Sequence, residues 1–160
     1  MKIFITSDTH FNHSNIIKYC NRPFTDIKKM NEEIIKRWNS VVSNDDIVYH
    51  LGDFGFGSFE ELKDIFDKLN GKKYLIMGNH DYKLGKNFYK EIGFLEVYRK
   101  ECILDNFILT HHPKEVYDNK INLYGHIHDK PLKPVFDNKK HFCVCLDRTD
   151  FYPIELDSVK

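Results

Sequence analysis

Short polar motifs that follow apolar segments are the part of this sequence able to do chemistry. The tetrapeptide Gly78-Asn79-His80-Asp81 comes directly after Tyr74–Met77, an apolar run with the composition of a buried strand. Gly and Asn both tolerate positive φ, so the chain is expected to turn sharply where that strand ends. The turn then presents an amide oxygen, an imidazole and a carboxylate at a strand end, where open α/β sheets bind ligands. A polar β-turn with an incidental histidine is the alternative interpretation.

Comparable motifs follow four other apolar segments. Those segments are expected to be strands over residues 2–7, 47–51, 107–110 and 121–124, and the motifs behind them are Asp8-Thr9-His10, Gly52-Asp53, His111-His112-Pro113 and Gly125-His126-Ile127-His128-Asp129. In extended backbone, residues two apart point to the same side, so Asp8 and His10 can reach one centre together. A single Asp-x-His or His-x-His is a weak metal signal, but its recurrence after several strands is not.

Seven of these side chains form one candidate ligand set: Asp8, His10, Asp53, Asn79, one of His111 and His112, His126 and His128. Seven nitrogen and oxygen ligands exceed what one tetrahedral zinc ion takes. They suit two ions of octahedral-like coordination that share a bridging carboxylate. Because no cysteine is among them, manganese, iron, zinc or nickel is favoured over a thiolate-bound metal.

Three polar residues in the loop behind Asp8 and His10 are candidates to hold substrate oxygens, namely Asn12, His13 and Arg22. An ordinary exposed loop is the alternative for each of them. His50 lies inside the strand 47–51, which favours a core or supporting role over a ligand role.

The elements that must position these residues alternate in the first half of the chain. Apolar residues at three- and four-residue spacing predict a helix over residues 26–42, with Thr25 as its N-cap. Ser58-Phe59-Glu60-Glu61 matches a capping box at the start of a second helix, which Gly71 is expected to end. A third helix is expected over residues 84–92. Strands and helices thus alternate through residue 92, an α/β pattern.

The second half of the chain contains short strands with little helix between them. They are expected over residues 95–104, 107–110, 121–124, 142–146 and 151–156, and are predicted to form a second, largely antiparallel sheet.

Composition limits the function classes. The chain has 160 residues, 41% of them hydrophobic and 30% charged, and 24 basic residues balance 24 acidic ones. A single soluble domain over residues 1–160 is expected, and zero net charge argues against a strong global attraction to nucleic acid or to a membrane surface. No apolar stretch is long enough to span a membrane, and residues 1–5 lack a signal-peptide pattern. The four cysteines form no Cys-x-x-Cys pair, which is typical of core thiols in a reducing, cytoplasmic protein.

Taken together, the motifs resemble those of the calcineurin-like metallophosphoesterase superfamily. The series Asp8-x-His10, Gly52-Asp53, Gly78-Asn79-His80-Asp81, His111-x-Pro113 and Gly125-His126-x-His128 follows the family's order. The segments 8–13, 22–24 and 146–153 are similar to those of its small single-domain bacterial and phage members.

The resemblance implies a four-layer α/β/β/α sandwich of two mixed β-sheets flanked by helices. It implies one metal held by Asp8, His10, Asp53 and His128, and a second held by Asp53, Asn79, His111 and His126, with Asp53 bridging. His111 is preferred to His112 because the family's ligand lies two residues before a proline. His80 takes the place of the family's catalytic histidine that binds no metal. The roles of His112, His50 and His141 stay open.

The implied activity is hydrolysis of phosphate esters with two divalent transition-metal ions, manganese first, with iron, zinc or nickel as alternatives. Such a pair supplies a bridging hydroxide near neutral pH and polarises phosphoryl oxygens, so no phosphoenzyme is needed. A phosphodiesterase acting on small or nucleotide-derived substrates is favoured, because zero net charge disfavours a long basic groove. A phosphomonoesterase, a nucleotide pyrophosphatase and a nuclease are the alternatives. A catalytically silent metal-binding scaffold is the non-enzyme alternative, and the complete ligand set argues against it.

Overall fold

Two β-sheets lie face to face in the computed structural model, which describes residues 1–159. The first sheet has the order β4-β3-β2-β1-β9, and the second has the order β5-β6-β7-β8. The strands of the first sheet are β1 (Ile3–Thr6), β2 (Ile47–His50), β3 (Lys72–Ile76), β4 (Val97–Tyr98) and β9 (Ile154–Glu155). The strands of the second are β5 (Glu101–Leu104), β6 (Phe107–Thr110), β7 (Ile121–Tyr124) and β8 (His141–Cys143). Both sheets are mixed, because β9 runs antiparallel to β1, and β5 antiparallel to β6.

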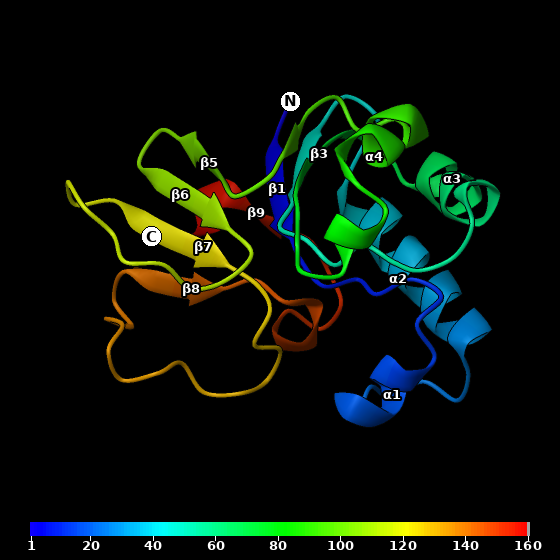
Figure 1. The fold of residues 1–160 in the computed structure, drawn as a ribbon, viewed down its shortest axis with the longest axis horizontal. Coiled ribbons are helices and arrows are strands. Elements are labelled where there is room, and N and C mark those ends of the chain that lie inside the picture. The colour runs from blue at the N-terminus through cyan, green and yellow to red at the C-terminus, as the bar shows by residue number, and fades with distance from the viewer. Residues whose placement is uncertain (160) are drawn as a thin grey trace.

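The helices pack on the outer face of the first sheet, on the right of Figure 1. The α-helices are α1 (Asn15–Tyr19), α2 (Ile27–Val41), α3 (Phe59–Lys68) and α4 (Lys86–Ile92). Short 3-10 turns cover η1 (Asp81–Lys83), η2 (Leu146–Arg148) and η3 (Leu156–Ser158). Alternation along the strands divides the core in two. Phe4 of β1 joins the cluster under α2 and α3, whereas its neighbour Ile5 joins the cluster between the two sheets.

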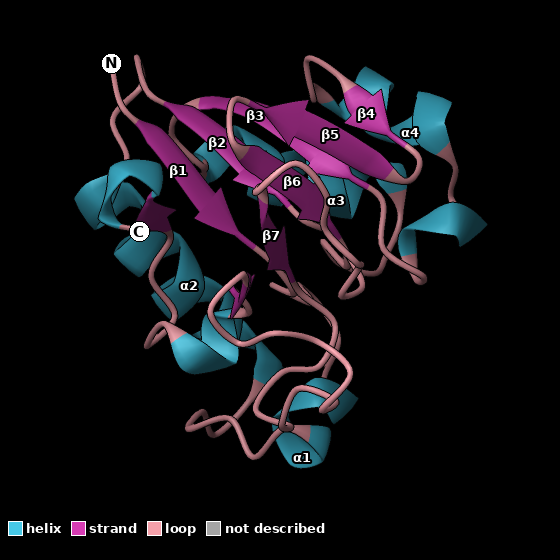
Figure 2. Cartoon of the chain, turned by 90° about the vertical axis from the view of Figure 1, so that its left-hand side faces the viewer, coloured by secondary structure: helices cyan, strands magenta, loops and turns pink. Residues whose placement is uncertain are grey.

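The predicted fold class of two mixed sheets with flanking helices is confirmed. In the part of the chain that the structure describes, however, loops take the place of an outer helical layer over the second sheet, as Figure 2 shows from that side. Asn122 anchors these loops, because its buried side chain accepts from the Lys114 backbone N–H and donates to Thr110 Oγ1. The ring of His141 completes the anchor through the carbonyl oxygens of Asp137 and Lys114. His141 thus fastens loops on the outer face of this sheet.

The prediction of a largely antiparallel second sheet is wrong. β6 pairs with β7 in parallel register, and β7 pairs with β8 in the same way. This difference matters for the site, since antiparallel neighbours would place their carboxyl ends at opposite edges of the sheet. The parallel register instead brings the residues that follow β6 and β7 to the same edge.

Several element boundaries also differ from the sequence prediction. The strand expected over residues 95–104 is divided between the two sheets as β4 and β5, and the last strand, β9, pairs with β1 in the first sheet. Asp26 is the N-cap of α2 in place of Thr25, because its carboxylate accepts from the Lys29 N–H. The capping box at Ser58 is confirmed. α3 ends at Lys68, so Gly71 lies in the turn into β3. No helix among residues 1–159 is long and apolar enough to cross a membrane.

Candidate metal centre

The candidate ligands follow five strands whose carboxyl ends meet at one edge of the two sheets. Asp8 follows β1, Asp53 follows β2, Asn79 follows β3, His111 follows β6 and His126 follows β7. Direct backbone contacts join these turns, since the Asp8 N–H donates to Gly52 O at 2.9 Å and the Gly125 N–H to His111 O at 2.9 Å. The two sheets therefore bring together candidate ligands that are up to 120 positions apart in the sequence, from Asp8 to His128.

Backbone strain accompanies this convergence. Asp8, His10, Asp53, His126 and His128 all have φ between 49° and 68°, in the left-handed region. Such conformations cost about 1–3 kcal/mol each and persist where the surrounding structure enforces them, most often at functional sites. Five of the seven candidate ligands are thus in conformations that local propensity does not favour.

Two glycines make room for the carboxylates. A Cβ at Gly78 would collide with Asp53 Oδ1, and a Cβ at Gly125 would collide with Asp8 Oδ2 and Ser7 Oγ. These close approaches explain why glycine precedes Asn79 and His126 in the motifs.

The first group of ligands surrounds Asp8. Its Oδ1 lies 3.5 Å from His10 Nε2 and 3.6 Å from His128 Nε2, and His10 Nε2 lies 3.6 Å from Asp53 Oδ2. Ligands of a divalent ion such as zinc lie about 2.0–2.2 Å from it, so two ligands of one ion are roughly 3–3.6 Å apart. Asp8 Oδ1 and His10 Nε2 are buried and have no hydrogen-bond partner in the described residues. Two unsatisfied, converging donor atoms fit a metal ion between them.

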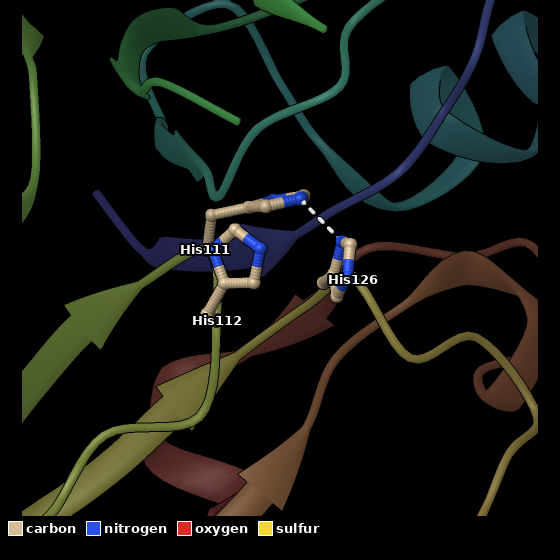
Figure 3. Close-up of side chains that lie close together, drawn as sticks. All are labelled: His111, His112 and His126. Atoms are coloured by element: carbon tan, nitrogen blue, oxygen red, sulfur yellow. Dashed lines mark hydrogen bonds between the residues drawn. The ribbon is translucent and has the colours of Figure 1, made fainter. Parts of the chain in front are cut away.

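The second group surrounds His111. Its Nε2 lies 3.0 Å from Asn79 Oδ1, 3.2 Å from His126 Nδ1 and 3.3 Å from Asp53 Oδ2. Its Nδ1–H donates to the Leu51 carbonyl at 2.7 Å, which orients the ring and leaves Nε2 facing the group. Figure 3 shows the imidazoles of His111 and His126 turned toward each other. Asp53 Oδ2 therefore lies between the two groups.

The negative charges of the neighbouring carboxylates raise the pKa values of two of the candidate histidine ligands. Burial lowers the pKa of His111, but the hydrogen bond to Asp53 and the charges of Asp8 and Asp53 outweigh it and raise that pKa to about 9. Burial also lowers the pKa of His128, but the carboxylates of Asp147 and Asp8 outweigh this effect and raise that pKa to about 10. A cation bound at this site would take the place of those protons, so metal binding releases protons.

Arg22 and Asp147 support His128 from behind. Asp147 Oδ1 lies 2.7 Å from His128 Nδ1, and this contact directs Nε2 toward Asp8. Arg22 donates to both oxygens of Asp147, at 3.0 and 3.1 Å, and to the carbonyls of Asp8 and Thr9. Arg22 is only 4% exposed and lies behind the ligands. These contacts occupy the donors of Arg22, so the geometry favours a supporting role over the expected substrate contact, which stays a prediction.

Replacing Arg22 should cost stability. Arg22→Met leaves Asp147 and two carbonyls without their donor, and breaking a buried ion pair of this kind costs about 3–5 kcal/mol. Urea unfolding of the metal-free protein measures this loss. Lys63→Met is the matched control, because its exposed ion pair with Asp67 is worth about 0.5 kcal/mol or less. Equal small losses in the two variants would contradict the assigned role of Arg22.

Asp81 has a supporting role that was not predicted from the sequence. Its buried carboxylate accepts from the backbone N–H groups of Asp53 and Gly78, at 2.8 and 2.7 Å, and so joins the turns after β2 and β3. Burial and the charge of Asp53 raise the pKa of Asp81 to about 6. Its place in the Gly-Asn-His-Asp turn was the available signal. Asp147 lies in the segment 146–153 that resembles small members of the family, but its contact with Arg22, 125 residues away, could not be predicted from the sequence.

Asn12 and His50 also hold loops in place. The Asn12 amide donates to Phe56 O and accepts from Asn31, so both of its polar groups have partners within the chain, and its expected substrate contact stays a prediction. His50 is fully buried, and burial lowers its pKa to about 3. Its ring accepts from the Gly52 N–H and contacts Thr9 Oγ1, which confirms the expected core or supporting role.

A cleft of about 510 Å³ opens from the ligands toward solvent. His80, His13 and Phe56 lie on its wall together with the exposed ring of Tyr19. The backbone N–H of His80 donates to Asp53 Oδ1 at 3.1 Å, so this histidine is fixed beside the ligands while its ring stays exposed. The structure thus places His80 and His13, but not Asn12 or Arg22, where a substrate could reach them.

Comparisons with known proteins found a matching family model, related sequences and a similar fold. A model of the family described as calcineurin-like phosphoesterase matches residues 1–130. An uncharacterized protein of Methanocaldococcus jannaschii is 36% identical over 99% of this chain and 89% of its own length. The gene 66 protein of Mycobacterium phage L5 is 34% identical over 56% of this chain and 45% of its own. A crystal structure of a protein of unknown function from Aquifex aeolicus, 24% identical, superposes over 99% of this chain and 97% of its own, with a TM-score of 0.74, and shares the fold. The chain belongs to the calcineurin-like phosphoesterase family.

Proposed function

We propose that this metal-dependent phosphoesterase uses two divalent transition-metal ions and is a phosphodiesterase for small or nucleotide-derived substrates. The observation that carries the proposal is the position of Asp53 Oδ2, 3.6 Å from His10 Nε2 in one ligand group and 3.3 Å from His111 Nε2 in the other. One carboxylate oxygen that faces two separate groups of donors is what a bridging ligand requires. Manganese is the metal we favour, with iron, zinc or nickel as alternatives.

The residues divide the work between binding and proton transfer. Asp8, His10, Asp53 and His128 would hold one ion, and Asp53, Asn79, His111 and His126 the other. When bound, such a pair lowers the pKa of water and polarises phosphoryl oxygens. Asp147 orients His128, and the Leu51 carbonyl orients His111, so both rings are ready before an ion arrives. His80 lines the open cleft and would donate a proton to the leaving oxygen.

Three cationic or aromatic features of the cleft favour a diester over a monoester. A phosphomonoester carries two negative charges and has one organic substituent beside the ions. A phosphodiester has a second organic substituent, which must lie against the wall of the cleft. The wall next to His80 has that room, with Phe56 and Tyr19 on it and Lys130 at its rim. His13, whose pKa is lowered to about 4 by burial and by the neighbouring His10, stays neutral there. A partly aromatic wall with a cation at its rim suits an ester group.

With manganese, a bis-aryl phosphodiester is expected to turn over faster than the matching aryl monoester. Purified protein that has been stripped with chelator and reloaded should show this order in kcat/KM. A monoester preference would overturn the diesterase proposal while leaving the metal site intact. No turnover of either ester by protein that carries two ions would instead support the silent scaffold.

A further inference from the structure

The segment that passes from the first sheet to the second carries two adjacent cations, Arg99 and Lys100, between β4 and β5. On one side, the Met77 N–H donates to the Tyr98 carbonyl at 2.8 Å, so Arg99 lies beside the turn that holds Asn79. On the other side, Glu101 pairs with Thr110 in the antiparallel register of β5 and β6. Lys100 therefore lies beside the residues that follow β6. The two cations are placed between two ligand-bearing turns.

A cleft of about 340 Å³, which we call the crossover cleft, lies where the chain passes from the first sheet to the second. Its polar lining consists of Tyr82, Arg99, Lys100, Thr110, His111, His112 and Lys114. Lys114 is paired with Glu101 at 2.6 Å. Arg99 and Lys100 are exposed and form no ion pair within residues 1–159. No acidic residue lines the cleft. On a chain with zero net charge, this is a local excess of positive charge.

His112 connects the crossover cleft to the candidate metal centre. Its exposed ring lies 4.1 Å, centroid to centroid, from that of His126 and 4.9 Å from that of His111. Figure 3 shows His112 beside the facing pair of imidazoles. Of these three, His111 and His112 line the crossover cleft, whereas His126 lines the larger cleft near His80. Each cleft therefore reaches the candidate metal centre through a different ligand.

A hydrogen bond from η1 holds the backbone of the segment that carries Arg99 and Lys100. The Tyr82 hydroxyl donates to the Arg99 carbonyl, and Tyr82 belongs to η1, the turn that follows His80. This contact ties the cationic segment to the turn that carries Asn79 and His80.

We propose that the crossover cleft binds a second phosphate group of the substrate, next to the phosphodiester that is hydrolysed. Arginine binds phosphate oxygens through two parallel N–H donors, and lysine adds a point charge. This inference rests on the proposed phosphodiesterase function and narrows its substrate class to nucleotides that carry a terminal phosphate beside the scissile bond. The aromatic cleft next to His80 receives the remaining nucleoside.

The test compares dithymidylate with and without a terminal phosphate, in both the 5′- and the 3′-phosphorylated forms. For the wild type with manganese, one phosphorylated form should have a KM about ten-fold lower than the unphosphorylated dinucleotide, which is the effect of about 1.4 kcal/mol in binding. In the double variant Arg99→Gln/Lys100→Gln, the ratio of the two KM values should fall to about one. Raised salt should weaken the preference in the wild type.

The matched control is Lys28→Gln/Lys29→Gln, which removes two adjacent exposed lysines at the start of α2. It should keep the wild-type ratio. A wild-type ratio of one, or an equal loss of the ratio in both double variants, would overturn the proposal. If no dinucleotide is hydrolysed, the phosphodiesterase function fails on its own. Calorimetry of the same dinucleotides with manganese-loaded protein then tests phosphate binding in the crossover cleft. The proposal requires that the wild type binds a phosphorylated form more tightly than the unphosphorylated one, and that Arg99→Gln/Lys100→Gln does not.

Discussion

Asp53→Asn is expected to abolish activity and to remove both metal ions together. The substitution keeps the shape of the side chain but takes away the charge of the oxygen that faces His10 and His111. We expect kcat/KM to fall by more than the roughly 10²–10³-fold that loss of one electrostatic donor costs in enzymes. Elemental analysis of the purified variant should show both metals depleted in parallel.

His10→Ala is the comparison for Asp53→Asn, because His10 belongs to one ligand group only. This variant should lose mainly one ion and keep the other. If Asp53→Asn retained two metals and full activity, or lost only one ion as His10→Ala does, Asp53 would not be the bridging residue.

His80→Asn is expected to keep both metals and to lose rate according to the leaving group. The His80 ring is exposed in the cleft while its backbone N–H is fixed by Asp53 Oδ1 at 3.1 Å. General-acid catalysis of this kind is typically worth about 10²–10⁴ in rate. An alkoxide needs the proton, whereas nitrophenolate leaves readily without it. The loss should therefore be much larger on an alkyl phosphodiester than on a nitrophenyl one, measured on the same preparation.

His13→Asn is the comparison for His80→Asn, since His13 lies on the same wall of the cleft, but its ring Nδ1 lies 3.1 Å from Nδ1 of the candidate ligand His10. Any loss that it causes should be the same for both esters. An equal loss of rate on the two esters in His80→Asn, with metals intact, would remove the proton-donor role and leave His80 as an electrostatic contact. Loss of metal from His80→Asn would make it a residue that only braces the turn.

The sequence sufficed to predict the residues that meet at the site, for a physical reason. Apolar runs identify buried strands, and a polar motif behind each run lies at a carboxyl end, as Asp8 and Asp53 do. The amphipathic spacing of α2 and the capping box of α3 were also recognisable, because both signals are local.

Contacts between segments that are distant in the chain could not be predicted from the sequence. The connection from β6 to β7 spans residues 111–120 without a helix, shorter than the usual parallel crossover, so the sequence favoured an antiparallel pair. Arg22 looked like a loop residue free to bind substrate, because its partner Asp147 is far along the chain. The cationic crossing at Arg99 and Lys100 becomes visible only once β4 and β5 are assigned to different sheets.

Anomalous diffraction from crystals grown with manganese decides whether Asp53 joins two metal ions. We expect two anomalous peaks about 3.5–4 Å apart, as in dinuclear hydrolases, one on each side of Asp53 Oδ2. Asp8, His10 and His128 should surround one peak, and Asn79, His111 and His126 the other. A single peak, or two peaks that do not share Asp53, would show that Asp53 does not bridge two ions.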